Sequence, residues 1–301
     1  MNRIIFFLIL LFPGLVDAQT KDSSGNYVAS KIIDFSKTKV KYKSTVVSVP
    51  YREVRDEGQS PLLYRGPTLQ VAKYNERWRK KSMTKFEMVL GGGLIQTNKH
   101  RVDAQTKGAL LNMEVNYHYM VPFKKILKGR GDWYLGAILT NTFDGRLYSA
   151  LINNSFGYEF SNAINPATHF TYNFKMGQQN RAYQAGFKLN FSLLAHVIRP
   201  NFIGMEPAET YMDENIHPFA IFTHDNRIAL PNHFFRINTE VYFDRFKIGN
   251  NDKIRIFYGW GLHVTTLSQS NPLYAAYHNI GFVSMLYSEK SKKEKRAKNL
   301  K

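Results

Sequence analysis

A period-two alternation of apolar and polar residues recurs along this chain and limits what it can fold into. In residues 183–193 the odd positions are mostly large and apolar, and the even positions are Gln184, Gly186, Lys188, Asn190 and Ser192. Successive side chains of a strand point to opposite faces, whereas a helix would scatter both sets around its axis. The pattern therefore predicts a β-strand with one apolar and one polar face. Residues 111–121, 235–243 and 254–264 alternate in the same way.

Weaker alternating runs fill much of the remaining sequence, at 62–74, 82–95, 132–143, 146–160, 167–176, 217–224 and 276–288. Turn residues separate the runs, and Asp144-Gly145 suits a two-residue hairpin because glycine accepts a positive φ without steric cost. No long helical pattern appears. We predict an all-β fold, an antiparallel transmembrane β-barrel of about 10–12 strands. The runs number eleven, so an even count needs a further strand in Thr38–Val49 or the fusion of two weak runs.

The first residues predict export from the cytoplasm. Arg3 precedes an unbroken apolar run from Ile4 to Phe12, and small residues end the segment at Ala18. Residues 1–18 are therefore expected to be a signal peptide, cleaved before Gln19. A membrane helix would need roughly 20 apolar residues, which this run lacks. The expected organisation is then a polar lead-in at 19–60, the β-barrel at 61–288 and a basic tail at 289–301.

Composition excludes several classes of function. The chain has no cysteine, which rules out disulfides, thiolate metal sites and a cysteine nucleophile. The formal net charge of +18 suggests an acidic partner, an acidic membrane surface or nucleic acid. Because an exported chain does not meet nucleic acid inside the cell, nucleic acid is not an expected partner.

Alternation alone does not say which face points inward, because a soluble β-barrel or sandwich alternates equally well with its apolar face inside. Three features favour the membrane version. The best runs approach the roughly 9–11 residues that cross a bilayer. The polar faces carry few solubilising charges, and the strand count is high for a sandwich. Several aromatic residues are candidates for interfacial girdles, with ordinary strand positions as the alternative: Tyr117, Tyr119, Trp133, Tyr134, Tyr172, Tyr183, Trp260 and Tyr287.

In its signal-peptide ending and its aromatic strands, the chain resembles outer-membrane β-barrels of Bacteroidota-type bacteria. The residues that carry the resemblance are Val16-Asp17-Ala18 before Gln19, the aromatic strand Ala182–Leu193 and the final strand near Ile280–Tyr287. The resemblance covers most of the mature chain without a diagnostic motif. It implies a location in the bacterial outer membrane, and it transfers no catalytic or binding residue. The basic tail after Tyr287 departs from the common ending, in which an aromatic residue closes the last strand.

Charged residues on the polar faces are the candidate site residues. Glu114, Lys188, Arg236, Glu240 and Arg255 are expected to face the lumen, as ion-pair ladders or as a selectivity surface. His169-Phe170-Thr171 is a weak match to a hydrolase pair, since threonine stands in the nucleophile position. Asp213, Glu214, His217 and His224 are a weak metal-site candidate. No catalytic residue is assigned, and no metal or cofactor is expected.

Three functions remain open. The first is a non-enzymatic outer-membrane barrel that acts as a narrow channel or as a component of an envelope assembly. The second is an outer-membrane lipid-modifying hydrolase, and the third is a secreted soluble β-protein that binds a ligand. The expected partners are outer-membrane lipid and other envelope proteins. Detergent dependence separates the third function from the other two, and an assay on lipid A and phospholipids separates the second from the first.

Overall fold

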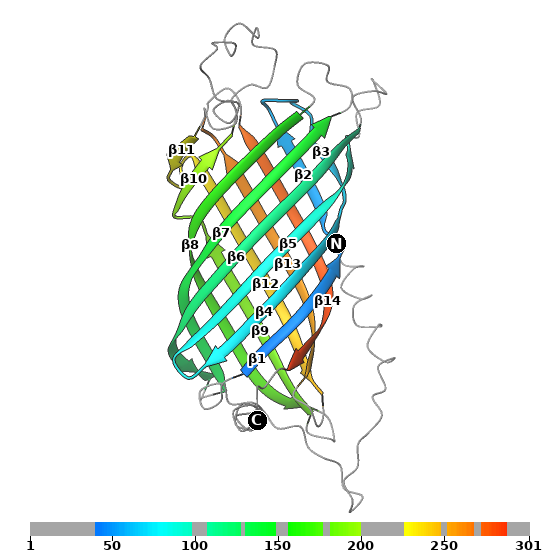
Figure 1. Ribbon diagram of the computed structural model, residues 1–301. Helices are drawn as coiled ribbons and strands as arrows, with labels where there is room; N and C mark the ends of the chain where they lie inside the picture. Colours follow the sequence, from blue (N-terminus) through cyan, green and yellow to red (C-terminus); the bar gives the residue numbers. More distant parts are fainter. Residues whose placement is uncertain are drawn as a thin grey trace, which may run out of the picture.

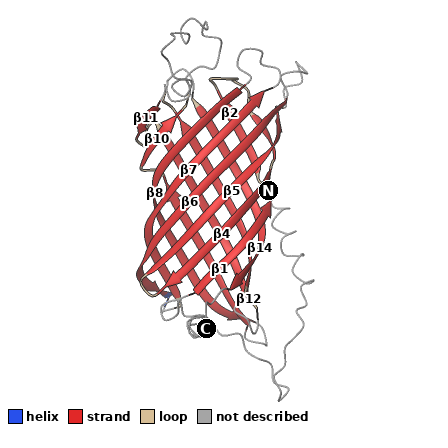
Figure 2. Ribbon diagram, viewed as in Figure 1, coloured by secondary structure: helices blue, strands red, loops and turns tan. Residues whose placement is uncertain are grey.

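The computed structural model describes residues 40–97, 107–127, 130–148, 156–176, 181–199, 226–247, 252–267 and 272–287. These residues form fourteen strand segments in a single antiparallel sheet that closes on itself, as the ribbons show (Figure 1, Figure 2). The segments are β1 (Val40–Ser48), β2 (Tyr51–Asp56), β3 (Tyr64–Pro67), β4 (Leu69–Arg79), β5 (Ser82–Gln96), β6 (Lys107–Ile126), β7 (Gly131–Tyr148), β8 (Phe156–Met176), β9 (Arg181–Phe191), β10 (Leu194–Ile198), β11 (Asn226–Ala229), β12 (Phe234–Phe246), β13 (Lys253–Thr265) and β14 (Leu273–Tyr287). None of the described residues forms a helix long and apolar enough to span a membrane.

Eight of these segments are halves of four interrupted strands, so the closed barrel has ten strands. β1 and β2 pair with β14 in one continuous register, and β3 and β4 continue each other against β2 and β1. In the same way, β10 follows β9 along β8, and β11 precedes β12. The order around the barrel is β1–β4–β5–β6–β7–β8–β9–β12–β13–β14, and β14 pairs again with β1. The prediction of an antiparallel barrel is confirmed.

The strands are strongly staggered. Following paired residues once around the closed sheet leads from Glu159 to Thr171, both on β8. A stagger of twelve residues tilts every strand against the barrel axis, as Figure 1 shows. Side chains from distant parts of the sequence therefore meet at the same height in the lumen.

An even number of strands places both ends of the barrel chain at one end of the molecule, where Tyr42 pairs with Tyr287. The connections at this end are short, such as Lys80–Lys81 between β4 and β5. We call it the short-turn end, and the opposite end, which includes the connection 199–225, the long-connection end. Outer-membrane barrels keep their short turns in the periplasm. The long-connection end of the barrel is therefore the extracellular end.

Apolar side chains cover the outside of the barrel, and polar ones fill the inside. Met113, Leu139 and Phe282 are each about half exposed on the outer face, at 50%, 49% and 50%. Glu76 and Asp244 have no exposed surface on the inner face. A soluble barrel would reverse this arrangement, since water would meet the outer face and apolar side chains would fill the interior. The outer face is therefore built for lipid.

Part of the predicted strand pattern needs correction in the middle of the chain. The predicted hairpin at Asp144-Gly145 is wrong, because both residues lie within β7. Asp144 faces the lumen, where it accepts a 2.7 Å hydrogen bond from Asn112 Nδ2. Its polarity therefore serves the interior of the barrel instead of a turn. The run 146–160 is not one strand, because its first residues end β7 and its last five begin β8, the long strand that also contains the whole run 167–176. The two runs therefore do not add two strands to the count.

The barrel also begins earlier than expected, because β1 and β2 lie in the segment assigned to a polar lead-in. In β1 the two faces are reversed relative to most of the other strands, because large apolar side chains point inward and a basic side chain points outward. Val40, Tyr42 and Val46 point inward and are buried, whereas Lys43 points outward. A basic outer face made this strand look like a solvated segment. The signal peptide, the run 217–224 and the basic tail lie outside the described residues.

Part of the aromatic set proposed for the girdles points outward, as a girdle requires. Tyr117 and Tyr119 are exposed on the outer face, and Trp133 stacks on Phe170 with ring centroids 5.0 Å apart. Tyr172 and Tyr183 lie in an outer aromatic row near the short-turn end with Phe174 and Phe243. Trp260 takes an outward position of β13. Tyr134 and Tyr287 were placed wrongly, because their positions in β7 and β14 face the interior, where both pack in the buried cluster.

Candidate functional site

The lumen contains a cavity of about 150 Å³, with mostly polar side chains around it. Its lining includes five basic and four acidic side chains: Arg52, Lys85, Arg146, Lys188, Arg236, Glu87, Glu114, Asp144 and Glu240. A polar cavity of this size has room for several water molecules. The near balance of charges, most of them in pairs, gives the lumen no strong preference for one sign of ion.

All five charged residues predicted from the sequence lie on the inner face of the barrel. The Arg236 guanidinium crosses the lumen from β12 and forms an ion pair with Glu114 on β6. Its Nη1 also donates a 2.6 Å hydrogen bond to Thr142 Oγ1 on β7. Lys188 Nζ on β9 lies 2.8 Å from Glu240 Oε1 on β12. Arg255 takes part in a second group of charges, nearer the short-turn end.

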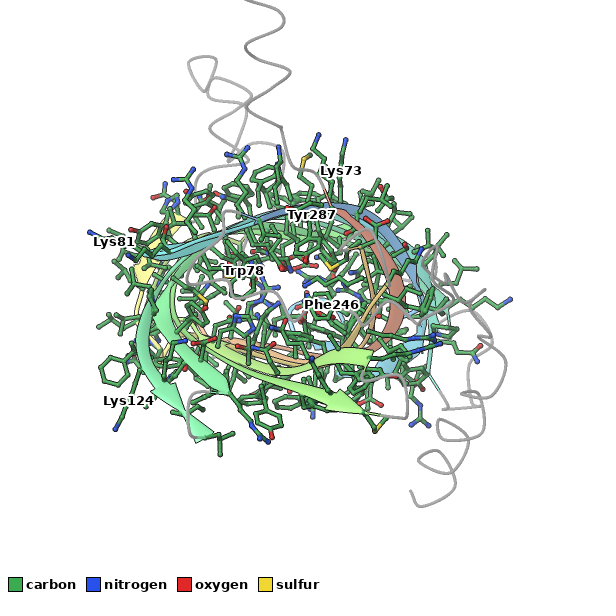
Figure 3. The ribbon with its side chains drawn as sticks, turned by 90° about the horizontal axis from the view of Figure 1, so that it is seen from below. Lys73, Trp78, Lys81, Lys124, Phe246 and Tyr287 are labelled. Carbon is green, nitrogen blue, oxygen red and sulfur yellow. The ribbon has the colours of Figure 1, made fainter. Side chains whose placement is uncertain are left out.

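This second group forms a partition across the lumen, which we call the septum. It consists of four charged and three aromatic side chains: Glu76, Asp244, Lys253, Arg255, Trp78, His169 and Tyr242. Each is at most 2% exposed, so water does not reach this level of the barrel. Figure 3, seen from the short-turn end, shows Trp78 and Phe246 pointing into the barrel and Lys73, Lys81 and Lys124 pointing away from it.

Ion pairs tie three strands together in the septum. Asp244 on β12 accepts two hydrogen bonds from Arg255 on β13, at 2.6 Å from Nε and 2.8 Å from Nη2. Lys253 Nζ lies 2.8 Å from Asp244 Oδ2 and 3.3 Å from Glu76 Oε1, which reaches in from β4. Two acids and two bases thus neutralise one another without water. Such a group is stable only while all its members are present, since a lone charge would remain buried.

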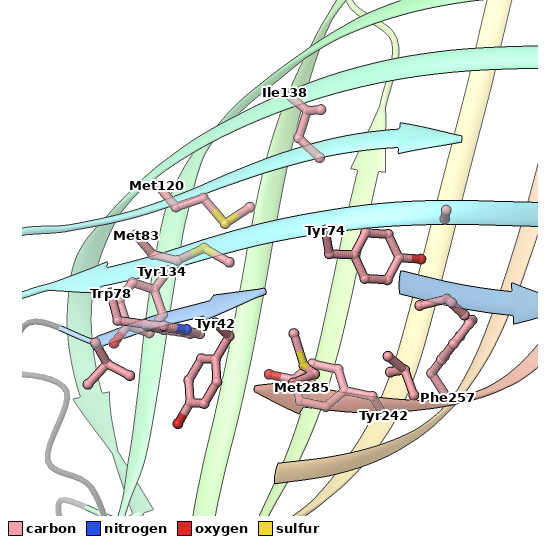
Figure 4. Packing of buried hydrophobic residues seen from close by; sticks show 14 of the residues in the cluster. Tyr42, Tyr74, Trp78, Met83, Met120, Tyr134, Ile138, Tyr242, Phe257 and Met285 are labelled. Atoms are coloured by element: carbon pink, nitrogen blue, oxygen red, sulfur yellow. The ribbon is translucent and has the colours of Figure 1, made fainter. Parts of the chain in front are cut away.

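Aromatic rings complete the septum. Trp78 on β4 lies with its ring centroid 5.7 Å from that of His169 on β8, almost opposite in the ten-stranded ring. Trp78 Nε1 donates a 2.6 Å hydrogen bond to Glu76, and a 2.7 Å hydrogen bond joins His169 Nε2 and the Tyr242 hydroxyl. The Arg255 guanidinium lies 3.8 Å from the Tyr242 ring centroid. The contacts therefore form a closed circuit around the lumen, and Figure 4 shows two of its rings, Trp78 and Tyr242, with Tyr42, Tyr134 and Met285 nearby.

A glycine makes room for one of these rings. A Cβ at Gly186 would lie 2.0 Å from Cζ of Tyr242, so only glycine fits at this position of β9. In the sequence, Gly186 belongs to the even positions of residues 183–193, which alternate with large apolar side chains. The missing side chain leaves space for the Tyr242 ring to lie close to the backbone of β9.

A further ion-pair group lies at the long-connection end. Asp56 on β2 contacts Arg146 on β7 at 3.0 Å and Arg199, which follows β10, at 2.6 Å. Glu159 pairs with His263 at 3.0 Å. Sequence analysis missed Asp56 and Glu76 because both lie in interrupted strands whose alternation is weak.

The geometry does not support a hydrolase built on His169 and Thr171. Both side chains point inward and are at most 2% exposed. The His169 ring packs on Trp78, Tyr134 and Tyr242, so a lipid substrate has no route to it. Within the described ranges, no group of three or more metal-ligating side chains converges on one point. The predicted metal candidates, Asp213, Glu214, His217 and His224, lie outside those ranges.

A closed, even-stranded antiparallel barrel with a lipid-facing apolar exterior and a polar lumen defines a class of protein. That class is the outer-membrane β-barrel, a membrane protein of the Gram-negative cell envelope. The chain has the architecture of this class in each of these respects, and the soluble alternative is excluded by its exposed apolar face.

Comparison with known proteins gives only remote likenesses. No protein-family model matches the chain, and no curated protein matches it in sequence. Among solved structures, an outer membrane channel from Pseudomonas putida F1 is 10% identical, with 85% of this chain and 100% of that chain covered and a TM-score of 0.32. The translocator domain of the autotransporter NalP from Neisseria meningitidis is 7% identical, with 83% and 90% covered and a TM-score of 0.28. At such scores the likeness adds nothing to the geometry.

Proposed function

We propose that this barrel is a non-enzymatic outer-membrane channel for small hydrophilic solutes, closed at the septum in the conformation described. The observation that carries the proposal is the polar cavity, which has room for water and whose lining residues Lys188 and Glu240 contact Tyr242 and Arg255 of the septum. A barrel of about eight strands is filled by its own side chains, whereas ten strands leave internal space. No backbone segment of the described residues fills that space. Side-chain rotations alone would therefore connect the cavity to the short-turn end.

The narrow lumen limits the size of the solutes that can pass. Arg236 forms an ion pair with Glu114 on the side of the septum that faces the long-connection end. Asp56 forms ion pairs with Arg146 and Arg199 still nearer that end. Charged side chains therefore bridge the lumen at three levels. Ions and small polar molecules fit such a path when the bridges move, and large solutes do not.

Conductance in planar lipid bilayers tests this function. The wild-type barrel is expected to show small, infrequent current steps. Trp78→Ala combined with His169→Ala removes the two rings that meet across the septum, and the steps are expected to become larger and longer. Adding Arg236→Ser, which shortens the side chain at the next bridge, should increase the conductance again.

Trp260→Ala is the matched control, because it removes the same ring from the outer face of β13 and should leave the current unchanged. Migration of the unheated protein on a gel reports whether each variant is folded. A folded triple variant with no more current than the wild type would mean that the barrel is sealed and serves a structural role in the envelope. Large, stable steps in the wild type would contradict a closed septum.

We also infer a source and partners for the chain. The signal-like ending at Ala18 and the aromatic final strand near Tyr287 support an origin in a Bacteroidota-type bacterium. Outer-membrane lipid and other envelope proteins are the proposed partners, because the outer face is apolar and the protein has a strong positive charge. Nucleic acid is not among them.

A further inference from the structure

The outer face of the barrel carries a group of basic side chains on two neighbouring strands, β1 and β4. Lys43 lies opposite Asn75, and Thr45 lies opposite Lys73. Arg77 is next along β4 and points the same way. We call these five residues the basic array. Directly opposed side chains on one face of a sheet are about 5 Å apart, so a single anionic group can touch several of them.

The array extends unusually far into the lipid-facing surface. Lys73 is six residues from Arg79, the last residue of β4. At about 3.3 Å per residue and a tilt of about 40°, this places it about 15 Å along the axis from the short-turn end. Two of the side chains beside Lys73 on the same face are apolar, Val71 on β4 and Met88, its partner on β5, and they are 42% and 49% exposed. A cation facing lipid at such a depth is costly unless an anion accompanies it.

No acidic side chain supplies that anion from within the described part of the chain. None of the described carboxylates pairs with Lys43, Lys73 or Arg77. The neighbours across the flanking strands are neutral, with Leu286 beside Lys43 and Thr84 beside Arg77. Inside the barrel, in contrast, nearly every buried cation has an acidic partner. The charge of the array is thus left for a ligand from the membrane.

We propose that the basic array binds the phosphate headgroup of an anionic phospholipid from the periplasmic leaflet. Lys43, Lys73 and Arg77 would contact the phosphate, and the amide of Asn75 would donate a hydrogen bond to it. The acyl chains would lie along Val47, Val71 and Leu90, which are exposed just above the array. Lysine suits this role because its apolar stem lies along the wall while its ammonium group reaches the headgroup.

Charge and position together favour lipid over other occupants. A second copy of the chain would bring the same positive surface into contact with itself. An acidic protein would have to enter the lipid layer to reach Lys73. An anionic lipid is already at that depth, and its phosphate lies near the short-turn end, where the array begins.

Native mass spectrometry of the full mature barrel in mixed micelles, with equimolar phosphatidylglycerol and phosphatidylcholine, tests the proposal. Each cation near an anionic surface contributes a factor of about five, so three give a preference for phosphatidylglycerol of roughly a hundredfold. Lys43→Gln, Lys73→Gln and Arg77→Gln together should remove most of this preference. Lys81→Gln, Lys124→Gln and Lys175→Gln together remove the same charge elsewhere at the short-turn end and should retain it.

Three results would overturn the proposal. The first is a wild-type barrel that binds both lipids equally, which would leave an acidic protein as the occupant. The second is an equal loss in the array and control variants, which would mean that only total charge matters. The third is a wild-type dimer in phosphatidylcholine alone that becomes a monomer in the array variant, which would assign the surface to a second copy. Heat-dependent migration on a gel verifies that each variant is folded.

Discussion

Replacing Asp244 with asparagine is expected to lower the free energy of unfolding by about 3–5 kcal/mol. Asp244 has no exposed surface, and it accepts hydrogen bonds from Arg255 while lying 2.8 Å from the Lys253 ammonium. Asparagine keeps the size of the side chain and removes its charge. Two buried cations would then share Glu76, at 3.3 Å and 3.6 Å, with only the more distant Glu240, 3.9 Å from Arg255, beside it, and part of their positive charge would remain uncompensated.

Urea unfolding of the barrel in lipid vesicles measures this loss. Asp132→Asn is the matched control, because Asp132 pairs with the exposed Lys125 at 3.9 Å and a surface pair of this kind contributes at most about 1 kcal/mol. The double variant Asp244→Asn with Arg255→Gln should lose less than the sum of the two single changes, since the residues act as a pair. Equal effects of Asp244→Asn and Asp132→Asn would mean that water enters the septum.

The strands could be predicted wherever the two faces differ strongly in polarity. In β9 and β12 the apolar set is outside and the polar set inside, so period two identifies both the strand and its faces. The pattern fails in β1 and β4, where Lys43 and Lys73 point outward and Tyr42 and Trp78 point inward. Their composition is typical of a solvated segment or of a soluble strand. Only closure of the barrel, which pairs β1 with β14, determines the position of these strands.

The sequence predicts which charged residues face the lumen, but it does not predict which of them pair with one another. Alternation alone placed Glu114, Lys188, Arg236, Glu240 and Arg255 on polar faces. It gave no partners, because these depend on the stagger between strands around the whole barrel. Glu76 and Lys253 are separated by 177 residues and meet only because of that stagger. A change of register by two residues would keep every face and break each of these pairs.

The last prediction tests the two faces directly, at neighbouring positions of β9. Leu189→Arg is expected to destabilise the barrel by about 2–4 kcal/mol if its position is near the bilayer midplane. Leu189 lies between Phe187 and Phe191 on the outer face, and both are exposed to lipid at 36% and 40%. Its partner on β12 is Thr239, so no acidic side chain on the adjacent strand is placed to pair with the new charge.

Asn190→Arg is the matched control, since it introduces the same side chain one residue further along. Asn190 lines the cavity and accepts a 3.3 Å hydrogen bond from Asn238 Nδ2. An arginine at this position has water and polar groups within reach, and its cost should be clearly smaller than that of Leu189→Arg. Urea unfolding in vesicles and the yield of heat-modifiable protein measure both changes. Similar losses for the two variants would mean that the faces are assigned wrongly, because a one-residue shift in register exchanges the inside and the outside of a strand.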